Sequence, residues 1–209
     1  TNCPCANPCT IAVPHVHAFC PEQNGSAGET RGAKTIDAIV PAYNEETTVA
    51  EVAKALMMSG QFGRVIVVDD GSTDGTAKEA ASSGAEVISL PSNGGKTAAM
   101  FAGVAASTAP DIAFFDADAT VILPEHAKTL VDAYRSGDYA QVCGTLDGEY
   151  SNGAILNTSR LGTGERIVSR RVLDSVPVTC GGYTAETAIN YAADKLGKTH
   201  TVRLSGLTL

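Results

Sequence analysis

The chain has 209 residues, a formal net charge of −8 and a hydrophobic fraction of 44%. A chain of this length is expected to form one domain, or one domain with a tail, and to bury a sizeable core. The negative charge and the lack of a basic run disfavour a nucleic-acid partner and electrostatic docking to an anionic membrane. No stretch predicts a transmembrane helix, and the N-terminus lacks the pattern of a signal peptide. We therefore expect a cytoplasmic enzyme whose contact with a membrane is peripheral at most.

Residues 1–32 are rich in Cys, Pro, Asn and Gly and show neither a helical nor a strand period. They are predicted to form a tail, and residues 33–209 a single catalytic domain. Several tail side chains lie close enough in sequence to hold Zn²⁺ together. They are Cys3, Cys5, Cys9, His15, His17 and Cys20. Their spacing matches no paired Cys-x2-Cys pattern, so structural zinc, disulfides and free thiols all remain open.

From residue 35 onward, short apolar runs alternate with segments of helical spacing. The apolar runs predict strands at 35–40, 64–68, 86–90, 112–115, 139–143 and 199–204. The helical spacing predicts helices at 46–58, 73–83, 95–107, 124–136, 166–176 and 184–195. Residues 144–164 are rich in Gly, Asn, Ser and Thr and predict a loop. The alternation indicates an α/β fold with a mostly parallel, partly mixed sheet and helices on both faces.

A polar cluster follows each of the first four predicted strands. The four clusters are Tyr43-Asn44-Glu45, Asp69-Asp70-Gly71, Asn93-Gly94-Gly95-Lys96 and Asp116-Ala117-Asp118. In sheets of this kind, ligands bind beyond the carboxyl ends of the strands. We therefore expect all four clusters to face one crevice.

The Asp116-Ala117-Asp118 triplet places two carboxylates one residue apart, directly after an apolar run. Mg²⁺ and Mn²⁺ prefer oxygen ligands and are commonly bound by one or two carboxylates together with substrate phosphates. An ordinary turn would also favour aspartate, but two nearby anions at the rim of a core strand need a compensating cation. The triplet therefore predicts a divalent-metal site.

The other three clusters suit a nucleotide. Asp70 could accept hydrogen bonds from a base ring, and Gly71 lets the backbone pass close to a planar ligand. Tyr43 could stack on the base and Glu45 could hold ribose hydroxyls, although acids are also favoured at a helix N-terminus. The glycines before Lys96 expose backbone N–H groups, and the ammonium adds a positive charge suited to phosphate or to a carboxylate of the site.

Taken in this order, the four motifs resemble those of the inverting glycosyltransferases of family 2, which adopt the GT-A fold, over residues 34–209. The run 39–46 looks like the family's nucleotide-binding loop, and 68–76 like its most specific signature. The third cluster is similar to the Asn-x-Gly-Lys-Gly motif, with Thr97 at the final position. The resemblance implies that Asp118 binds the metal and that Asp116 lies at the diphosphate or the sugar. The rest of the implied donor site is Pro41, Ala42, Tyr43, Glu45, Asp70, Gly71, Lys96 and Ala117.

Within the family, the Asp-Ala-Asp form is similar to that of the dolichyl- and polyprenyl-phosphate sugar synthases. A segment beginning at Thr163 resembles their Ser-Gly-Phe-Arg-x-x-Arg-Arg-x-Val-Leu run, in which serine and arginine grip the acceptor phosphate. That role would fall to Thr163 and Arg166, and at least one of Arg170 and Arg171 is expected on a solvated helix face. The sequence departs at Thr120, where those synthases often carry a metal-binding glutamine, and it shows none of their C-terminal membrane helices.

Transfer to a hydroxyl acceptor needs a general base. We predict Glu186, because family members carry an acid at the start of the corresponding helix; an ordinary helix N-terminal acid is the alternative. The predicted function is metal-dependent, inverting transfer of a sugar, expected to be a hexose, from a UDP- or GDP-sugar. The acceptor would be a small molecule or a lipid phosphate such as polyprenyl phosphate. A nucleotidyltransferase and a non-catalytic nucleotide-sugar-binding module remain alternatives, and a homodimer is kept as a candidate assembly.

Overall fold

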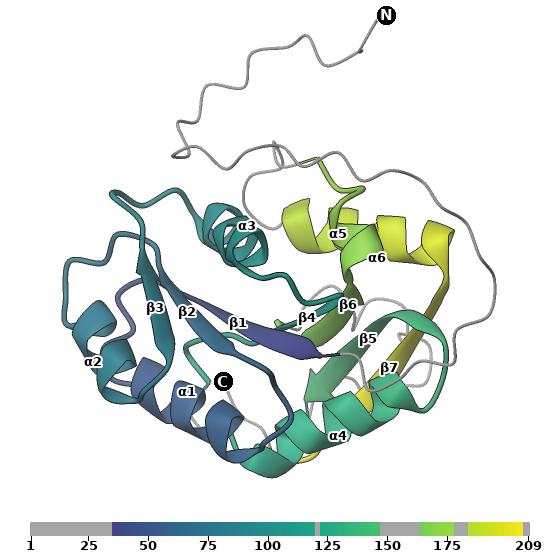
Figure 1. Cartoon of the computed structure of the whole chain (residues 1–209), viewed down its shortest axis with the longest axis horizontal. Helices are drawn as coiled ribbons and strands as arrows, with labels where there is room; N and C mark the ends of the chain where they lie inside the picture. The colour runs from purple at the N-terminus through teal and green to yellow at the C-terminus, as the bar shows by residue number, and fades with distance from the viewer. Residues whose placement is uncertain (1–34, 120–121, 147–163, 178–183, 207–209) are drawn as a thin grey trace, which may run out of the picture. The chain divides into compact units, whose positions relative to one another are not determined.

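The structure is a computed structural model that describes residues 35–119, 122–146, 164–177 and 184–206 (Figure 1). The described residues belong to one compact unit of the chain, Ala33–Leu209. The predicted tail with its zinc ligands lies outside the described residues, and so does Thr163. Those two predictions remain predictions.

The described residues form a seven-stranded sheet with the strand order β3-β2-β1-β4-β6-β5-β7. The strands are β1 Ile36–Ala42, β2 Val65–Asp69, β3 Glu86–Ser89, β4 Asp111–Phe114, β5 Tyr139–Leu146, β6 Arg166–Ser169 and β7 Lys198–Leu204. The β6 strand pairs antiparallel with both β4 and β5, whereas every other pair in the sheet is parallel. The expectation of a mostly parallel, partly mixed sheet is confirmed.

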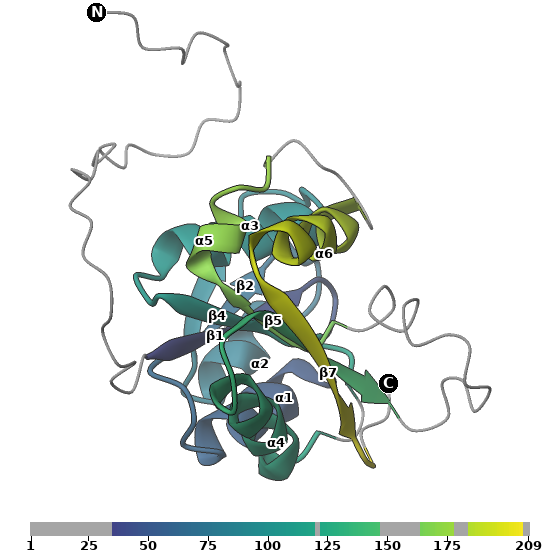
Figure 2. The ribbon, with the colours of Figure 1, turned by 90° about the vertical axis from the view of Figure 1, so that its right-hand side faces the viewer.

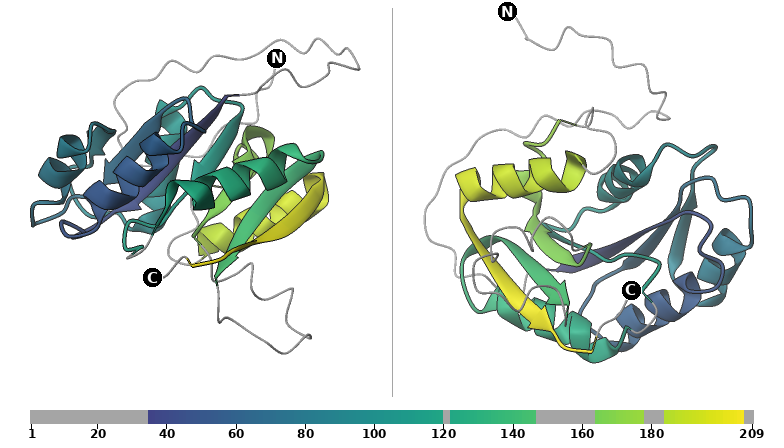
Figure 3. Two further views of the ribbon diagram at one scale, coloured as in Figure 1. Left: turned by 90° about the horizontal axis from the view of Figure 1, so that it is seen from below. Right: turned by 180° about the vertical axis from the view of Figure 1, so that it is seen from behind.

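Helices cover both faces of the sheet (Figures 1 and 2). One face carries α1 Val49–Met58, α2 Thr76–Ser82 and α4 Pro124–Arg135, and the other carries α3 Lys96–Ala106, α5 Arg170–Leu173 and α6 Thr184–Leu196. Each face has its own cluster of buried apolar side chains, and the view from behind shows the same three layers (Figure 3). The expected three-layer α/β/α arrangement is confirmed.

The central strands are apolar because both of their faces are covered. Every residue of β1, β2 and β4 is buried, including alternate residues that point to opposite faces. A strand buried on both sides reads as a continuous apolar run without a polar alternation. This is why the runs starting near residues 35, 64 and 112 could be recognised as strands.

One predicted helix was wrong in its first part. Residues 166–176 were expected to be helical, but Arg166–Ser169 is strand β6, and the helix α5 starts only at Arg170. The β-branched pair Ile167 and Val168 lies between β4 and β5 and pairs with both of them. The predicted loop at 144–164 also starts too early, because β5 continues to Leu146.

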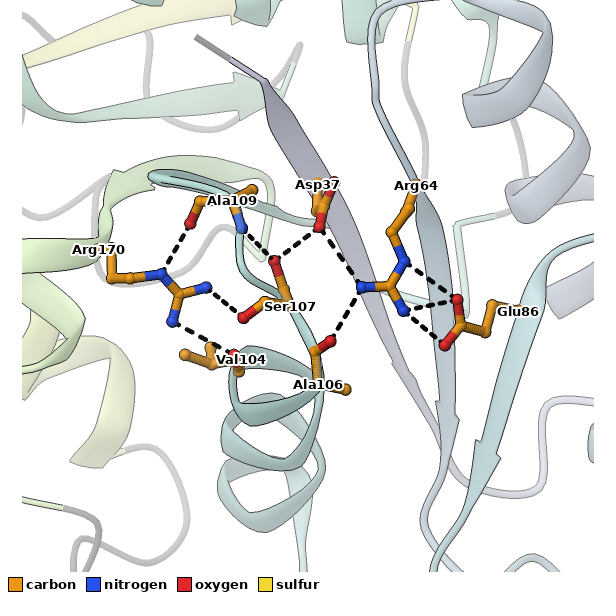
Figure 4. Close-up of polar contacts among 8 residues, drawn as sticks. All are labelled: Asp37, Arg64, Glu86, Val104, Ala106, Ser107, Ala109 and Arg170. Carbon is orange, nitrogen blue, oxygen red and sulfur yellow. Dashed lines mark hydrogen bonds and ion pairs between the residues drawn. The ribbon is translucent and has the colours of Figure 1, made fainter. Parts of the chain in front are cut away.

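The guanidinium of Arg170 caps the C-terminal end of α3 (Figure 4). It donates hydrogen bonds to the backbone carbonyls of Val104, Ser107 and Ala109, at distances of 3.3, 2.8 and 2.7 Å. The last carbonyls of a helix lack helical partners, so a cation placed there satisfies them. Arg171 is exposed, as expected for one of the two arginines.

A second set of contacts joins the same end of α3 to the sheet (Figure 4). The hydroxyl of Ser107 donates to Asp37 Oδ2 on β1 at 2.7 Å. The guanidinium of Arg64 lies 3.9 Å from that carboxylate and also donates to the backbone carbonyl of Ala106 at 2.9 Å. Arg64 in turn pairs with Glu86 at 2.6 Å. The C-terminal end of α3 is therefore bonded to the sheet near the starts of β1 and β2.

Candidate functional site

The carboxyl ends of β1, β2 and β3 line up at one edge of the sheet. Ala42 pairs with Asp69, and Asp69 pairs with Ser89, so the loops that follow these strands start side by side. Strand β6 runs in the opposite direction and begins at Arg166, which pairs with Phe114 near the end of β4. The chain therefore enters β6 from the same edge, which adds Gly164 and Glu165 to the site.

The first and second loops are interlocked by hydrogen bonds. Asn44 has a left-handed backbone, with φ 56, and its side chain accepts from the backbone N–H of Thr73 at 2.9 Å. The backbone N–H of Asn44 donates to the hydroxyl of Ser72 at 3.0 Å, and that of Glu45 donates to Thr76 Oγ1 at 2.7 Å. These bonds hold the expected nucleoside loops as one unit and leave Tyr43 exposed at 42%.

Asp70 shapes the glycine loop before α3. Its side chain is buried, and its two carboxylate oxygens accept from the backbone N–H groups of Gly94 at 2.8 Å and Gly95 at 2.7 Å. Each oxygen has a second lone pair, so contact with a base is compatible with these bonds. Gly71 has φ +69, and a Cβ there would lie 2.6 Å from the backbone carbon of Ser92. This close approach between two loops requires glycine.

Lys96 joins two of the predicted catalytic acids. It is the first residue of α3, and its ammonium lies 2.7 Å from Asp116 Oδ1 and 3.0 Å from Glu186 Oε1. Glu186 is in the first turn of α6 and is buried. Burial lowers the pKa of Lys96, but the charges of Asp116 and Glu186 and their hydrogen bonds outweigh this effect and raise it. The lysine is therefore a firmly held cation at the centre of the site.

The two aspartates of the triplet differ in environment. The Asp116 side chain is 18% exposed and bonded to Lys96, whereas Asp118 is exposed and Ala117 between them is buried. Among the residues that the structure describes, no three His, Cys, Asp or Glu side chains lie close enough to hold a metal ion together. Two carboxylates still fit Mg²⁺ or Mn²⁺, since these ions commonly take their remaining ligands from phosphate and water.

Gly164 and Glu165 are site residues that the sequence analysis missed. A Cβ on Gly164 would lie 2.1 Å from Asp116 Oδ2, so only glycine leaves room for that carboxylate. Glu165 is fully buried next to it. One sequence feature pointed to Glu165: an acid stands at this position, where the similar segment of the synthases has phenylalanine.

The buried carboxyl of Glu165 has a pKa that is unusually high for a glutamate. Burial, and next the negative charge of Asp116, raise the pKa of Glu165 to about 7 from its ordinary value of 4.5. Lys96 and Arg166 act in the opposite direction but do not cancel the rise. Around neutral pH this group can therefore exchange a proton, and a change in the charge around Asp116 would change its protonation.

Arg166, which the resemblance places at the acceptor phosphate, lies between the sheet and α6. Its side chain is fully buried, and its Nη1 donates to Asn190 Oδ1 on α6 at 3.2 Å. The same oxygen accepts from Gln141 Nε2 on β5 at 2.6 Å. The guanidinium therefore links the sheet to α6, and its expected contact with an acceptor phosphate stays a prediction.

Among the described residues, the structure has no helix with the length and apolar character needed to cross a membrane. The expected location in the cell and the candidate homodimer stay predictions.

A model described as glycosyl transferase family 2 matches residues 37–187, which is more than half of the chain. The matched region includes the four strand-end clusters, the Gly164-Glu165 segment and Glu186.

Solved structures with a similar fold bind nucleotides and metals. Glucosyl-3-phosphoglycerate synthase from Mycobacterium tuberculosis, in complex with Mn²⁺, UDP-glucose and phosphoglyceric acid, has a TM-score of 0.73 and 26% identity. The match covers 84% of this chain and 71% of that chain. The same synthase in complex with Mg²⁺ and UDP also gives a TM-score of 0.73, with 26% identity. These matches confirm the expected GT-A fold.

Curated relatives match over a shorter region. The 4,4'-diaponeurosporenoate glycosyltransferase of Staphylococcus aureus (strain bovine RF122 / ET3-1) is 35% identical over 107 residues. The match covers 49% of this chain and 28% of that protein, so the chain spans less than a third of the relative's length.

Proposed function

This chain belongs to glycosyl transferase family 2, and from that premise we propose that it transfers a sugar from a UDP-sugar to an acceptor with inversion. The observation that carries the proposal is the contact of Lys96 with both Asp116 and Glu186 at the carboxyl edge of the sheet. This contact joins the expected donor side to the expected acceptor side. The similar synthase structures with UDP and UDP-glucose favour uridine over guanosine in the donor.

For the donor, we propose that the nucleoside lies over the interlocked first and second loops. Exposed Tyr43 is the aromatic surface available to a base, and Glu45 lies beside it with an oxygen that accepts from Thr48 Oγ1 at 3.0 Å. Pro41 and Ala42 form the buried end of β1 beneath the loop, and Asp70 with Gly71 forms the neighbouring turn. The two loops are bonded to each other before a ligand arrives, which lowers the ordering cost of binding.

For the metal, we propose that Asp118 and Asp116 hold Mg²⁺ or Mn²⁺ together with the donor diphosphate, with Ala117 between them. When bound, the cation offsets the negative charge that develops on the departing diphosphate. The similar synthase structures contain these ions together with UDP, which supports the assignment. Lys96 lies beside Asp116 and remains positively charged, so it supplies a second cation next to the phosphates.

For the chemical step, we propose Glu186 as the general base. As the acceptor oxygen attacks the anomeric carbon, Glu186 takes the hydroxyl proton and the bond from that carbon to the diphosphate breaks. Its carboxylate is buried and fixed by Lys96, so its position is set before the acceptor binds. A phosphate acceptor is already ionised and would not need the base.

The acceptor we propose first is a small hydroxyl compound, and polyprenyl phosphate is second. Support for the order comes from the buried Arg166, which leaves a lipid phosphate without the expected guanidinium. The similar synthase binds phosphoglyceric acid, which also favours a small anionic acceptor. Thr163, the other expected acceptor contact, lies outside the described residues. The family match gives no support to a nucleotidyltransferase. A non-catalytic module would bind the donor without turning it over, which distinguishes it from our proposal.

The test is a thermal-shift and product-release screen of UDP- and GDP-sugars with Mn²⁺. A donor at 100 times its Kd stabilises the folded state by about 2.7 kcal/mol, which is readily seen as a rise in Tm. We expect UDP-sugars to raise Tm and to release UDP, and Asp118→Ala to abolish the release. Turnover retained in Asp118→Ala contradicts the metal assignment, and no response to any donor contradicts the proposed function. Donor binding without turnover would favour the non-catalytic module.

A further inference from the structure

A buried polar cluster lies between the sheet and α6, below the site. We call Gln141, Arg166 and Asn190 the Asn190 cluster. Asn190 Oδ1 accepts from both Gln141 Nε2 at 2.6 Å and Arg166 Nη1 at 3.2 Å. Gln141 and Arg166 are fully buried and Asn190 is 7% exposed. One oxygen on α6 is thus bonded to two adjacent strands, β5 and β6.

Burying the polar side chains of this cluster costs free energy. Moving a guanidinium out of water costs several kcal/mol unless good hydrogen bonds offset it, and apolar side chains of similar volume often stabilise as well or better. Hydrogen bonds, however, have a defined direction and length, so they fix position more narrowly than apolar contact does. A polar cluster in the interior is therefore expected where the placement of an element matters.

The apolar contact surface of α6 is built largely from small side chains. The buried residues that face the sheet are mainly Ala185, Ile189 and Ala193. Alanine side chains form shallow ridges, so neighbouring registers of the helix differ little in packing. The Asn190 cluster supplies the directional contacts that such a surface lacks.

Glu186 and Asn190 lie four residues apart on α6, and positions i and i+4 of a helix fall on the same face, one turn apart. A shift of the helix at Asn190 is therefore passed to Glu186 almost unchanged. Glu186 meets Lys96 at 3.0 Å, a contact that such a shift would break.

We propose that the Asn190 cluster positions Glu186, so that Arg166, Gln141 and Asn190 act on the reaction through the placement of that carboxylate. The proposal rests on the proposed function only where it takes Glu186 as the base. It assigns Arg166 a role different from the phosphate contact that the resemblance implied. Arg166 and Asn190 are then positioning residues that touch neither donor nor acceptor.

The kinetic test uses Asn190→Leu, with UDP-glucose and Mn²⁺ as the probe and water as the acceptor. A displacement of about 1 Å can cost about 100-fold in rate, so we expect kcat to fall by about 10- to 100-fold while KM for UDP-glucose is unchanged. Asn190→Asp keeps the accepting oxygen and should restore most of the rate. Tyr191→Leu, at an exposed position of the same helix, is the matched control and should leave kcat unchanged.

The double variant separates positioning from a merely structural role. In a Glu186→Gln background, Asn190→Leu should have no further effect on the residual rate, because its effect passes through Glu186. An equal loss in both backgrounds overturns the proposal, and so does an unchanged kcat in Asn190→Leu. If Asn190→Leu fails to fold, it is replaced in every comparison by Gln141→Leu, which removes the 2.6 Å bond to Asn190.

A crystal structure of Asn190→Leu tests the positioning role independently of turnover. We expect the contact between Lys96 and Glu186, 3.0 Å in the unaltered chain, to be lost in Asn190→Leu and kept in Tyr191→Leu. A contact retained in Asn190→Leu refutes the positioning role. If the unaltered protein releases no UDP, the proposed function fails, and this structural comparison alone supports or refutes the inference.

Discussion

Replacing Glu165 by glutamine should change how the stability of the protein depends on pH. The pKa of this carboxyl is raised from 4.5 to about 7 by burial and by Asp116, so the folded state favours the protonated form. The contribution of Glu165 to the free energy of unfolding is complete below pH 4.5 and is lost as the pH rises through about 7. At about 1.4 kcal/mol for each pH unit of that difference, the loss is about 3 kcal/mol.

The assay is urea unfolding of the unaltered protein and Glu165→Gln between pH 4 and pH 8, in EDTA so that no metal ion lies beside Asp116. Glutamine carries no charge at any of these pH values, so the variant should gain stability relative to the unaltered protein as the pH rises. The gain should approach about 3 kcal/mol at pH 8. Glu125→Gln, at an exposed position of α4, should show a difference below about 1 kcal/mol throughout. A Glu165→Gln difference that stays constant with pH would refute the reasoning.

Three further changes have predicted outcomes. Gly164→Ala places a Cβ about 2 Å from the Asp116 carboxylate, so UDP release should fall by about 100-fold; an unchanged rate would show that this carboxylate can move freely. Lys96→Met removes the ammonium that lies 2.7 Å from Asp116, so calorimetry should show tighter Mn²⁺ binding in the absence of nucleotide, together with weaker UDP binding. Arg170→Leu leaves three carbonyls at the end of α3 without their cap, which should cost about 1–3 kcal/mol in urea unfolding. The exposed Arg171→Leu is its control and should change stability by less than about 0.5 kcal/mol.

The placement of the polar clusters at one edge of the sheet was largely predictable from the sequence. Asp69-Asp70 and Asp116-Ala117-Asp118 each follow an apolar run, and the rule that ligands bind at the carboxyl ends of parallel strands places them at one edge. The structure confirms the strands and helices that carry them. The contacts of Asp70 with Gly94 and Gly95 were not predictable, because they depend on two loops 24 and 25 residues apart in the chain.

The segment around β6 could not be predicted, because its structure depends on residues that are distant in the sequence. Residues 166–169 form a strand only because β4 and β5 offer free edges on either side, and a four-residue run carries little periodic signal of its own. The burial of Arg166 depends on Asn190, 24 residues further along. Local sequence patterns therefore predicted a helix where residues 166–169 form a strand.

The reversed direction of β6 has a consequence for how family members can diverge. Strands β5 and β6 are antiparallel neighbours, with Cys143 paired to Arg166 and the backbone N–H of Gly144 donating to the carbonyl of Glu165 at 2.8 Å. The two ends of the connecting segment thus start and finish at adjacent points of the sheet. Doubling the length of such a connection costs only about 0.6 kcal/mol in chain entropy. Evolution can therefore exchange or lengthen this connection while the strand-end loops and every strand register stay as they are.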